Sequence, residues 1–250
     1  MTVRVATYNV RGMRDSVPAL VRVIAALRAD VLCLQEAPGP LHPRGGRTAL
    51  ARACGMRVAA ASPLAGVAVL AGPRCRVLHA EGRVLRFFAG LQVRALAVAV
   101  VEVDGTRLAV GSVHLDLHGG ARLRHAAEIM SVMRRVSADH GAAVVLGGDI
   151  NEQAHQPAWR YLAAQLVDCH PASGAGDGFT FSARRPRMRI DALFVASGTR
   201  VLSCAGAGAG EGAGEGAREG DAAGRGGGSG ADPAAASDHL PVVAELETGG

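Results

Sequence analysis

The stretch Ala142-Ala-Val-Val-Leu-Gly-Gly-Asp-Ile-Asn151 runs from apolar residues straight into a carboxylate and an amide two positions apart. An apolar run bounded by glycines is typical of a buried strand. Gly147 and Gly148 would let the backbone turn there or pass close to a ligand. Asp149 and Asn151 would then stand together at the strand end, where they could hold water, a metal ion or a phosphate. Taken alone, an Asx-type turn explains the stretch equally well, so the segments that accompany it must decide.

Composition indicates a soluble globular protein with a core of small side chains. The chain has 250 residues, enough for one large domain or two small ones, and is 49% hydrophobic but only 3% aromatic. A formal charge of +5 permits an anionic partner such as a phosphate ester or a nucleic acid. All 27 basic residues are arginine, which together with the excess of Ala and Gly indicates compositional drift rather than a recognition device.

The cysteines and the N-terminal residues favour a reduced, cytoplasmic protein. The five cysteines are far apart and form no C-x-x-C pair, which argues against a disulfide framework or a structural zinc site. The N-terminal residues lack the apolar segment of a signal peptide, and the most apolar windows are too short or carry an arginine. The cysteines are Cys33, Cys54, Cys75, Cys169 and Cys204.

The N-terminal part of the chain predicts a strand, a helix and a second strand. Val3–Tyr8 alternates and is rich in β-branched residues, so it predicts a strand that ends at Asn9. Ser16–Arg28 has a capping serine followed by an apolar helical face. Asp30–Gln35 is an apolar strand that ends at Glu36. A polar residue therefore follows each strand of this unit.

The same pattern recurs in the middle of the chain. Arg107–Val113 predicts a strand that ends at His114, Ala121–Ala138 predicts a helix, and Ala142–Leu146 predicts the strand that leads to Asp149. The apolar face of this helix is expected to hold Leu123, Ala126, Met130 and Met133. Two similar α/β halves are expected, with the polar strand ends of both converging.

The remaining elements surround one Gly/Ala-rich segment. Residues Ala205–Ala236 cannot bury a core and are expected to form a flexible insertion in a single domain spanning residues 1–250. Lengthening a surface loop in this way costs little free energy. The other expected elements are strands at Gly66–Ala71 and Leu91–Val103, a short helix opening at Pro157, strand-like segments at Phe179–Ser182 and Arg189–Val195, and a final strand at Leu240–Leu246.

Six short segments place polar, chemically reactive residues at the ends of apolar runs. They are Ala6-Thr-Tyr-Asn9, Leu34-Gln-Glu36, Ser112-Val-His-Leu-Asp116, Gly148-Asp-Ile-Asn151, Arg189-Ile-Asp191 and Ser237-Asp-His-Leu-Pro241. In this order the set resembles the endonuclease/exonuclease/phosphatase superfamily of metal-dependent phosphoesterases, from Asn9 to Pro241 without the Gly-rich insertion. The resemblance implies an α/β fold, a four-layer α/β/β/α sandwich of two packed, mostly antiparallel sheets flanked by helices.

The resemblance also implies a metal site at the first two motifs. Asn9 and Glu36 match the metal-site pair of the superfamily, and Asp238 would sit close to the ion. Mg²⁺ or Mn²⁺ is the expected cofactor, because a hard cation prefers oxygen ligands. In isolation, Glu36 would be a solvated carboxylate and Asn9 a turn or capping residue. Asp116 and Asp30 are interpreted as a turn residue and a strand-entry residue.

The later motifs imply the catalytic groups. Asp149 and Asn151 match the pair beside the attacking water, with the amide helping to hold the phosphate. His114 and His239 match two histidines that flank the scissile phosphate and stabilise charge on its oxygens. Asp191 matches the acid that fixes the tautomer of one imidazole. The general base stays open between Asp149 and His239.

The substrate is not determined by these motifs. Where this chain has Ser112–Asp116, the abasic-site repair branch carries a tyrosine and a Pro-Asn motif, so branches with a histidine there are nearer, including non-specific nucleases and lipid phosphodiesterases. The basic run Arg184, Arg185, Arg187 and Arg189 fits a solvated loop or a phosphate-contacting rim. A nuclease, a small-molecule or lipid phosphoesterase and a catalytically silent binding module all remain open. We expect a monomer without stable membrane association that acts on a nucleic acid or a small phosphorylated molecule.

Overall fold

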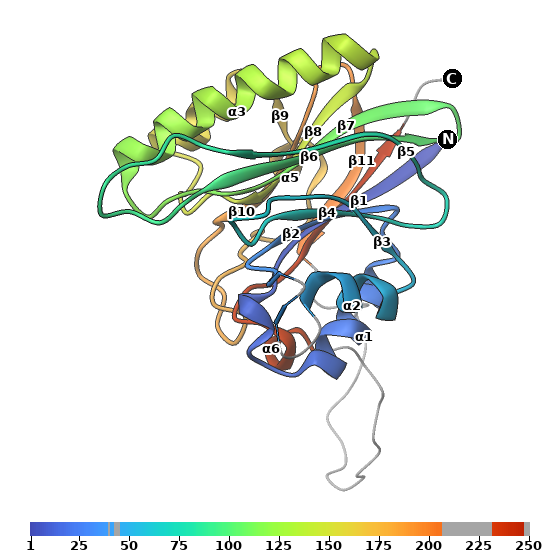
Figure 1. Cartoon of the computed structure of the whole chain (residues 1–250), viewed down its shortest axis with the longest axis vertical. Coiled ribbons are helices and arrows are strands. Elements are labelled where there is room, and N and C mark those ends of the chain that lie inside the picture. The colour runs from blue at the N-terminus through green and yellow to red at the C-terminus, as the bar shows by residue number, and fades with distance from the viewer. Residues whose placement is uncertain (40, 43–45, 207–231, 248–250) are drawn as a thin grey trace, which may run out of the picture.

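The apolar strands of the sequence form two six-stranded mixed sheets that pack face to face (Figure 1). The computed structural model describes residues 1–39, 41–42, 46–206 and 232–247. The first sheet has the order β11-β12-β1-β2-β4-β3. Its strands are β1 (Thr2–Asn9), β2 (Val31–Gln35), β3 (Arg57–Ala61), β4 (Ala68–Ala71), β11 (Arg200–Gly206) and β12 (Val242–Glu247).

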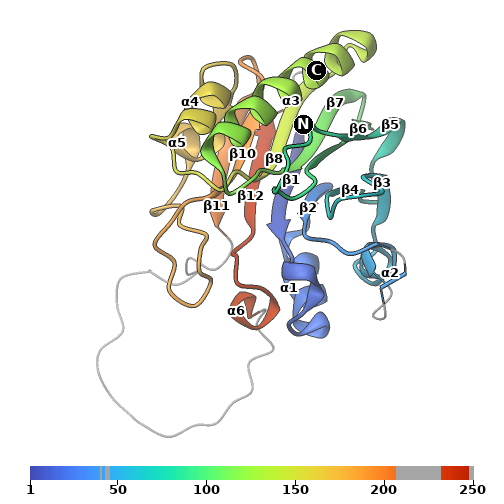
Figure 2. The same cartoon turned by 60° about the vertical axis from the view of Figure 1, so that its left-hand side comes forward.

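The second sheet has the order β5-β6-β7-β8-β10-β9. Its strands are β5 (Arg76–Val84), β6 (Ala95–Val103), β7 (Thr106–His114), β8 (Ala143–Asp149), β9 (Val167–Asp168) and β10 (Asp191–Val195). Figure 2 shows β12 between β1 and β11, so the last described strand lies inside the first sheet.

Helices cover the outer face of each sheet. Figure 1 shows α3 over the second sheet and α1, α2 and α6 against the first, which gives four layers and confirms the expected sandwich. The helices are α1 (Val17–Leu27), α2 (Gly46–Ala53), α3 (Gly119–His140), α4 (Pro157–Ala163), α5 (Cys169–Ser173) and α6 (Pro233–Ala236), with a 3-10 turn at Arg11–Met13. Among the helices of the described ranges, none is both long and apolar enough to cross a membrane.

The two predicted strand–helix–strand units are present. α1 joins β1 to its parallel neighbour β2, and α3 joins β7 to its parallel neighbour β8. The other strand pairs that the structure describes are antiparallel. Ser16 caps the start of α1, since its Oγ accepts a hydrogen bond from the Ala19 amide, as predicted for an N-cap.

The parallel registers bring the polar strand ends together. Asn9 lies opposite Gln35, so Glu36 follows directly beside it. His114 lies opposite Asp149 in the second sheet. The carboxyl ends of parallel strands meet at the same edge of a sheet, which is why sequence-distant motifs can share one site.

Small side chains fill the space between the sheets, as the composition predicted. Ala95, Ala97 and Ala99 of β6 are buried in this layer. A Cβ atom at Gly147 would lie only 3.1 Å from Cys33 Sγ of the facing sheet. No large aromatic side chain is among the described residues of this layer, so the sheets pack through small aliphatic, cysteine and glycine positions.

Several sequence-based expectations need correction. Gly147 and Gly148 do not turn the chain, because β8 continues through them to Asp149. Phe179–Ser182 forms isolated bridges rather than a strand. Of the four residues expected on the apolar face of α3, Ala126, Met130 and Met133 meet the sheet, whereas Leu123 is 38% exposed.

The Gly/Ala-rich insertion is shorter at both ends than expected. Ala205 and Gly206 belong to β11, and Pro233–Ala236 forms α6. Asp232 caps α6 by accepting hydrogen bonds from the amides of Ala234 and Ala235. The rest of the predicted insertion, residues 207–231, lies outside the described residues.

Candidate active site

The ends of three strands, two from the first sheet and one from the second, meet at one side chain. Asn9, the last residue of β1, is fully buried, and its Nδ2 donates to Glu36 Oε1 at 3.1 Å and to Asp149 Oδ2 at 3.0 Å. The Asn9 Oδ1 atom accepts a hydrogen bond from the Arg11 amide, which fixes the amide plane. Asn9 therefore joins the first motif to the second and to the fourth.

Asp149 lies at the centre of the site. It is 1% exposed, and its Oδ1 accepts the Asn151 amide at 3.0 Å. Its Oδ2 lies 3.4 Å from His114 Nε2 and 3.8 Å from His239 Nε2. The carboxylate is thus flanked by the two histidines that the motifs predicted.

Asp191 holds the ring of His239. Asp191 starts β10 directly opposite Asp149, and its Oδ2 lies 2.8 Å from His239 Nδ1. The Phe181 ring packs against the imidazole with a centroid separation of 4.9 Å. This pairing directs His239 Nε2 toward Asp149 and stabilises the protonated imidazole.

Burial and neighbouring charges set the protonation of these groups. Burial, followed by repulsion from Asp191, raises the pKa of Asp149 to about 7, although His239 opposes the shift. Burial lowers the pKa of His239, but the carboxylates of Asp191, Asp149 and Asp238 outweigh it and raise that pKa to about 9. Burial, Arg94 and His239 lower the pKa of His114 to about 3. At neutral pH the site pairs a charged His239 with a neutral His114.

Left-handed backbone follows three of the motif strands. Arg11, Glu36 and Asn151 have φ values of +46°, +51° and +53°. Non-glycine residues rarely adopt this conformation, and it concentrates at functional sites. The turn at Glu36 fits against Gly66, where a Cβ atom would come within 2.9 Å of the Glu36 Cα.

Asn151 and Asp238 lie at the border of the site. Asn151 Nδ2 donates to the Leu115 carbonyl at 3.0 Å, which ties the loop after β8 to the loop after β7. The side chain of Asp238 is 32% exposed and pairs with Arg11, whose Nε lies 3.2 Å from its Oδ2. Asp238 contacts Arg11 and Ser237 in the described structure, so its predicted place near a metal stays a prediction.

Two groups of side chains could hold a cation. The first group is Asp149, Asp191 and His239. Each offers one ligand atom, and these three atoms lie within 4.8 Å of one another. The pKa of His239 is raised by its bond to Asp191, and a protonated imidazole cannot ligate a metal. The carboxylate oxygens of Glu36 and Asp149, which both accept a hydrogen bond from Asn9 Nδ2, suit a hard divalent cation better.

A family model matches the part of the chain that carries these residues. The model of the Endonuclease/Exonuclease/phosphatase family matches residues 6–239, from the start of the first motif to the last histidine. The chain belongs to this family. Its members are phosphoesterase hydrolases.

Solved structures share the endonuclease/exonuclease/phosphatase fold over the whole chain. A family protein from Bacteroides thetaiotaomicron has a TM-score of 0.77 at 17% identity, covering 98% of this chain and 97% of that one. A mannosyl-6-phosphatase from the same organism has a TM-score of 0.75 at 17% identity, covering 98% and 100%. The human nocturnin catalytic domain has a TM-score of 0.68 at 15% identity, covering 98% and 94%. No curated protein matches the chain.

A buried ion pair that the sequence motifs did not reveal lies beside the candidate site. Arg94 is 8% exposed, and its Nε lies 3.6 Å from Asp116 Oδ2. Asp116 also accepts the His118 amide, so the turn interpretation is correct but incomplete. Arg94 lines a cleft of about 310 Å³ together with Glu36 and His114. The sequence signal was only an arginine just before the apolar run of β6.

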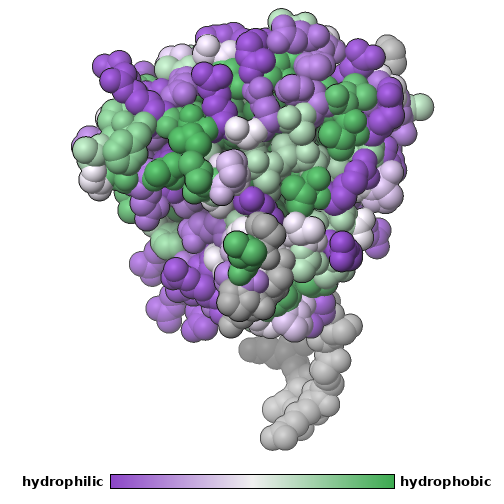
Figure 3. Space-filling model, in the orientation of Figure 1, coloured by the Kyte–Doolittle hydropathy of each residue, from purple (hydrophilic) through white to green (hydrophobic). Residues whose placement is uncertain are grey.

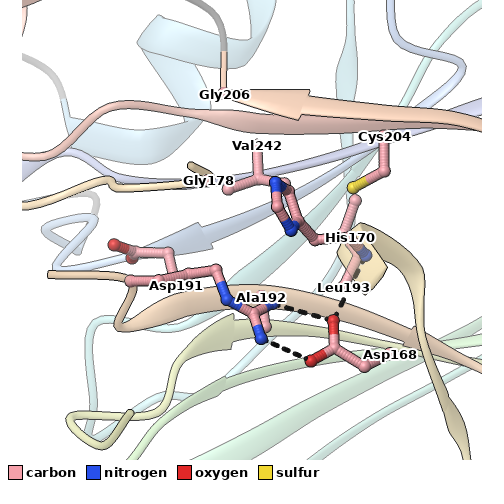
Figure 4. Close-up of a pocket in the computed structure, with 10 residues that line it drawn as sticks. Asp168, His170, Gly178, Asp191, Ala192, Leu193, Cys204, Gly206 and Val242 are labelled. Atoms are coloured by element: carbon pink, nitrogen blue, oxygen red, sulfur yellow. Dashed lines mark hydrogen bonds and ion pairs between the residues drawn. The ribbon is translucent and has the colours of Figure 1, made fainter. Parts of the chain in front are cut away.

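Arg189, in contrast, has a structural role. It forms two hydrogen bonds, of 2.9 and 2.8 Å, with the Asp168 carboxylate, and its guanidinium stacks 4.5 Å from the Trp159 ring. Figure 4 shows Asp168 turned toward these bonds, with His170 and the backbone of β10 around a cavity of about 10 Å³. Arg189 therefore ties the residue before β10 to Asp168 and Trp159. It is not part of a phosphate-contacting rim.

Proposed function

We propose that the protein is a divalent-metal-dependent hydrolase that cleaves phosphoester bonds by in-line attack of water. The observation that carries the proposal is the environment of Asp149: buried, fixed by Asn9 and the Asn151 amide, and flanked by His114 and His239. The family match supports the reaction class, and the order of the motifs supports the roles of the residues.

Asp149 is the proposed general base. Its pKa of about 7 lies near the working pH, where a base is most effective. His239 carries a proton at this pH because of Asp191, so it is not free to accept one from water. Of the two candidate general bases, Asp149 and His239, we therefore propose Asp149.

The remaining polar groups are proposed to bind the phosphoryl oxygens. The His239 imidazolium donates from Nε2, and neutral His114 donates from its ring on the other side of Asp149. Arg94 adds a positive charge in the same cleft as His114. Donors positioned in a buried site stabilise developing charge more strongly than they would in water.

Glu36, with Asn9 and Asp149, is proposed to hold Mg²⁺ or Mn²⁺, with Asp238 nearby. When bound, the cation would polarise the phosphoryl oxygens and help the leaving group depart. Asn9 keeps Glu36 and Asp149 together, since its Nδ2 contacts both carboxylates. Arg11 holds Asn9 in turn through its backbone amide.

Hydrolysis of bis-p-nitrophenyl phosphate tests this proposal. We expect turnover with Mg²⁺ or Mn²⁺, none in EDTA, and a loss of at least about 100-fold in Asp149→Ala, the scale of general-base catalysis. Asp139→Ala is the control, because Asp139 is exposed at the end of α3. Turnover that persists in EDTA or survives the loss of Asp149 would overturn the proposed site.

A further inference from the structure

A second hollow lies on the His239 side of Asp149. It has a volume of about 270 Å³ and shares no residue with the Glu36–His114 cleft. Asp149 contacts His114, which lines the cleft, and His239, which is the chain neighbour of Asp238 in the second hollow. Each hollow is therefore connected to Asp149 through a histidine. The second is lined by Arg11, Asp15, Ser182, Ala183, Arg184, Ala234, Ser237 and Asp238.

A loop with three arginines forms one wall of this hollow. The loop, residues 182–188, carries Arg184, Arg185 and Arg187, all exposed. Figure 3 shows hydrophilic side chains gathered at the lower left of the molecule, where Figure 1 draws the segment before β10 next to α6. We call residues 182–188 the arginine loop.

Backbone hydrogen bonds fix the arginine loop to the catalytic motif. The Ala183 amide donates to the Asp238 carbonyl at 2.7 Å, and the Leu240 amide donates to the Thr180 carbonyl at 2.8 Å. These bonds lie on both sides of His239. The arginines are therefore held next to the catalytic histidine and do not belong to an independent surface loop.

The arginine loop gives the surroundings of the hollow an excess of positive charge. Within the lining, Arg11 pairs with the carboxylates of Asp15 and Asp238, each at 3.2 Å, and Arg184 supplies the second positive charge, so the charged lining residues sum to zero. The excess comes from Arg185 and Arg187, which are exposed on the arginine loop beside the hollow. The planar guanidinium of arginine suits the oxygens of a phosphate group.

We propose that this hollow and the arginine loop bind a second, non-scissile phosphate of the substrate while the first phosphate lies at Asp149. The preferred substrate would then be a phosphoester that carries another phosphate close by, as nucleotides and sugar bisphosphates do. This inference rests on the proposed function for the location of the scissile phosphate.

Binding without turnover tests the second phosphate separately from catalysis. Calorimetry in EDTA compares thymidine 3′,5′-bisphosphate with thymidine 5′-phosphate, and fructose 1,6-bisphosphate with fructose 6-phosphate. We expect the bisphosphate of at least one pair to bind about tenfold more tightly, as one or two charge-assisted hydrogen bonds would provide. The pair that shows the preference identifies the source of the second phosphate.

The matched variants remove equal charge from two regions. Arg184→Gln/Arg185→Gln/Arg187→Gln should lose the preference for the bisphosphate. The control Arg22→Gln/Arg28→Gln/Arg52→Gln, at exposed positions on α1 and α2 and just after α1, should keep it. Equal binding within both pairs, or a preference that survives in the arginine-loop variant, would overturn the inference. Absence of bis-p-nitrophenyl phosphate hydrolysis alongside a retained bisphosphate preference would overturn only the proposed function.

Discussion

Asp149 is held in an environment that opposes its own charge. It is buried, faces the carboxylate of Asp191 across the β8–β10 ladder and carries a raised pKa. The same environment makes it a stronger base once it is ionised. The burial and the nearby Asp191 that make Asp149 a stronger base therefore also lower the stability of the fold.

Replacing Asp149 with Asn should remove activity but stabilise the metal-free fold. Between pH 3.8 and about 7 the folded protein keeps a proton that the unfolded chain has released, so stability falls as the pH rises through this window. The neutral amide of the variant does not ionise, so the variant does not lose this stability as the pH rises. We expect Asp149→Asn to raise Tm by about 2 °C or more at pH 8, with a smaller gain at pH 4. Calorimetry of both proteins in EDTA checks this, and a lower Tm for the variant at pH 8 would contradict it.

The pH profile of kcat/KM should have two limbs. Activity is expected to rise through about pH 7 as Asp149 loses its proton and to fall through about pH 9 as His239 loses its own. A bound cation favours ionised Asp149, so the acid limb measured with Mg²⁺ should lie below pH 7 and move to lower pH as the Mg²⁺ concentration rises. Initial rates on bis-p-nitrophenyl phosphate from pH 5 to 10 give the profile. Activity that rises through pH 9 would show that neutral His239 is the base.

At the scale of elements, the close pairing of β7 and β8 requires a glycine at position 148, next to Asp149. Gly148 is paired with Val113 of the parallel strand β7, and a Cβ atom at Gly148 would clash with the Val113 carbonyl. Any side chain there must push β7 and β8 apart, just where they carry His114 and Asp149.

Gly148→Ala should therefore weaken both folding and catalysis. Overpacking of this kind costs about 1–3 kcal/mol, so the urea midpoint should fall and kcat/KM should drop with it. Gly198→Ala is the matched control, since nothing lies within 4 Å of a Cβ at that position. Unchanged unfolding and kinetics in Gly148→Ala would show that the two strands can separate freely.

The elements also show what the sequence could and could not predict. Strands and helices with one clear apolar period were located within a few residues, as in β1, α1 and β7. β3 and β5 were missed because they are edge strands with mixed exposure and no clean alternation. Four of the six site motifs end an apolar strand and the other two directly precede one, so all six could be found in the sequence. Arg94 was not found, since its partner Asp116 is close only in the folded chain.

At the scale of the molecule, the site exists only where the two sheets are packed together. Asn9 of the first sheet bonds Asp149 of the second. Buried behind it, Gln35 Nε2 donates to Ser112 Oγ at 3.1 Å, and Ser112 Oγ donates to the Leu34 carbonyl at 2.8 Å. These polar bonds across the sheet interface fix the relative position of the halves.

Two deletions test which C-terminal parts of the chain are needed for folding: residues 207–231 and the last described strand, β12. Shortening residues 207–231 by half should leave Tm and bis-p-nitrophenyl phosphate turnover unchanged, because changing the length of a Gly- and Ala-rich segment is expected to cost little free energy. Removing Val242–Glu247 should prevent folding, since β12 pairs with both β1 and β11. Circular dichroism and thermal melts check both. A shortened chain that fails to fold would show that residues 207–231 have a structural role.

The position of β12 inside the first sheet also has a consequence during synthesis. β1 is synthesised before the other described strands, yet the partner on one of its sides is made more than 230 residues later. Until then one edge of β1 lacks its strand partner, and His239 has not reached Asp149. The nascent chain would therefore stay inactive toward phosphate esters and depend on chaperones or rapid translation to keep that open edge from pairing with other chains.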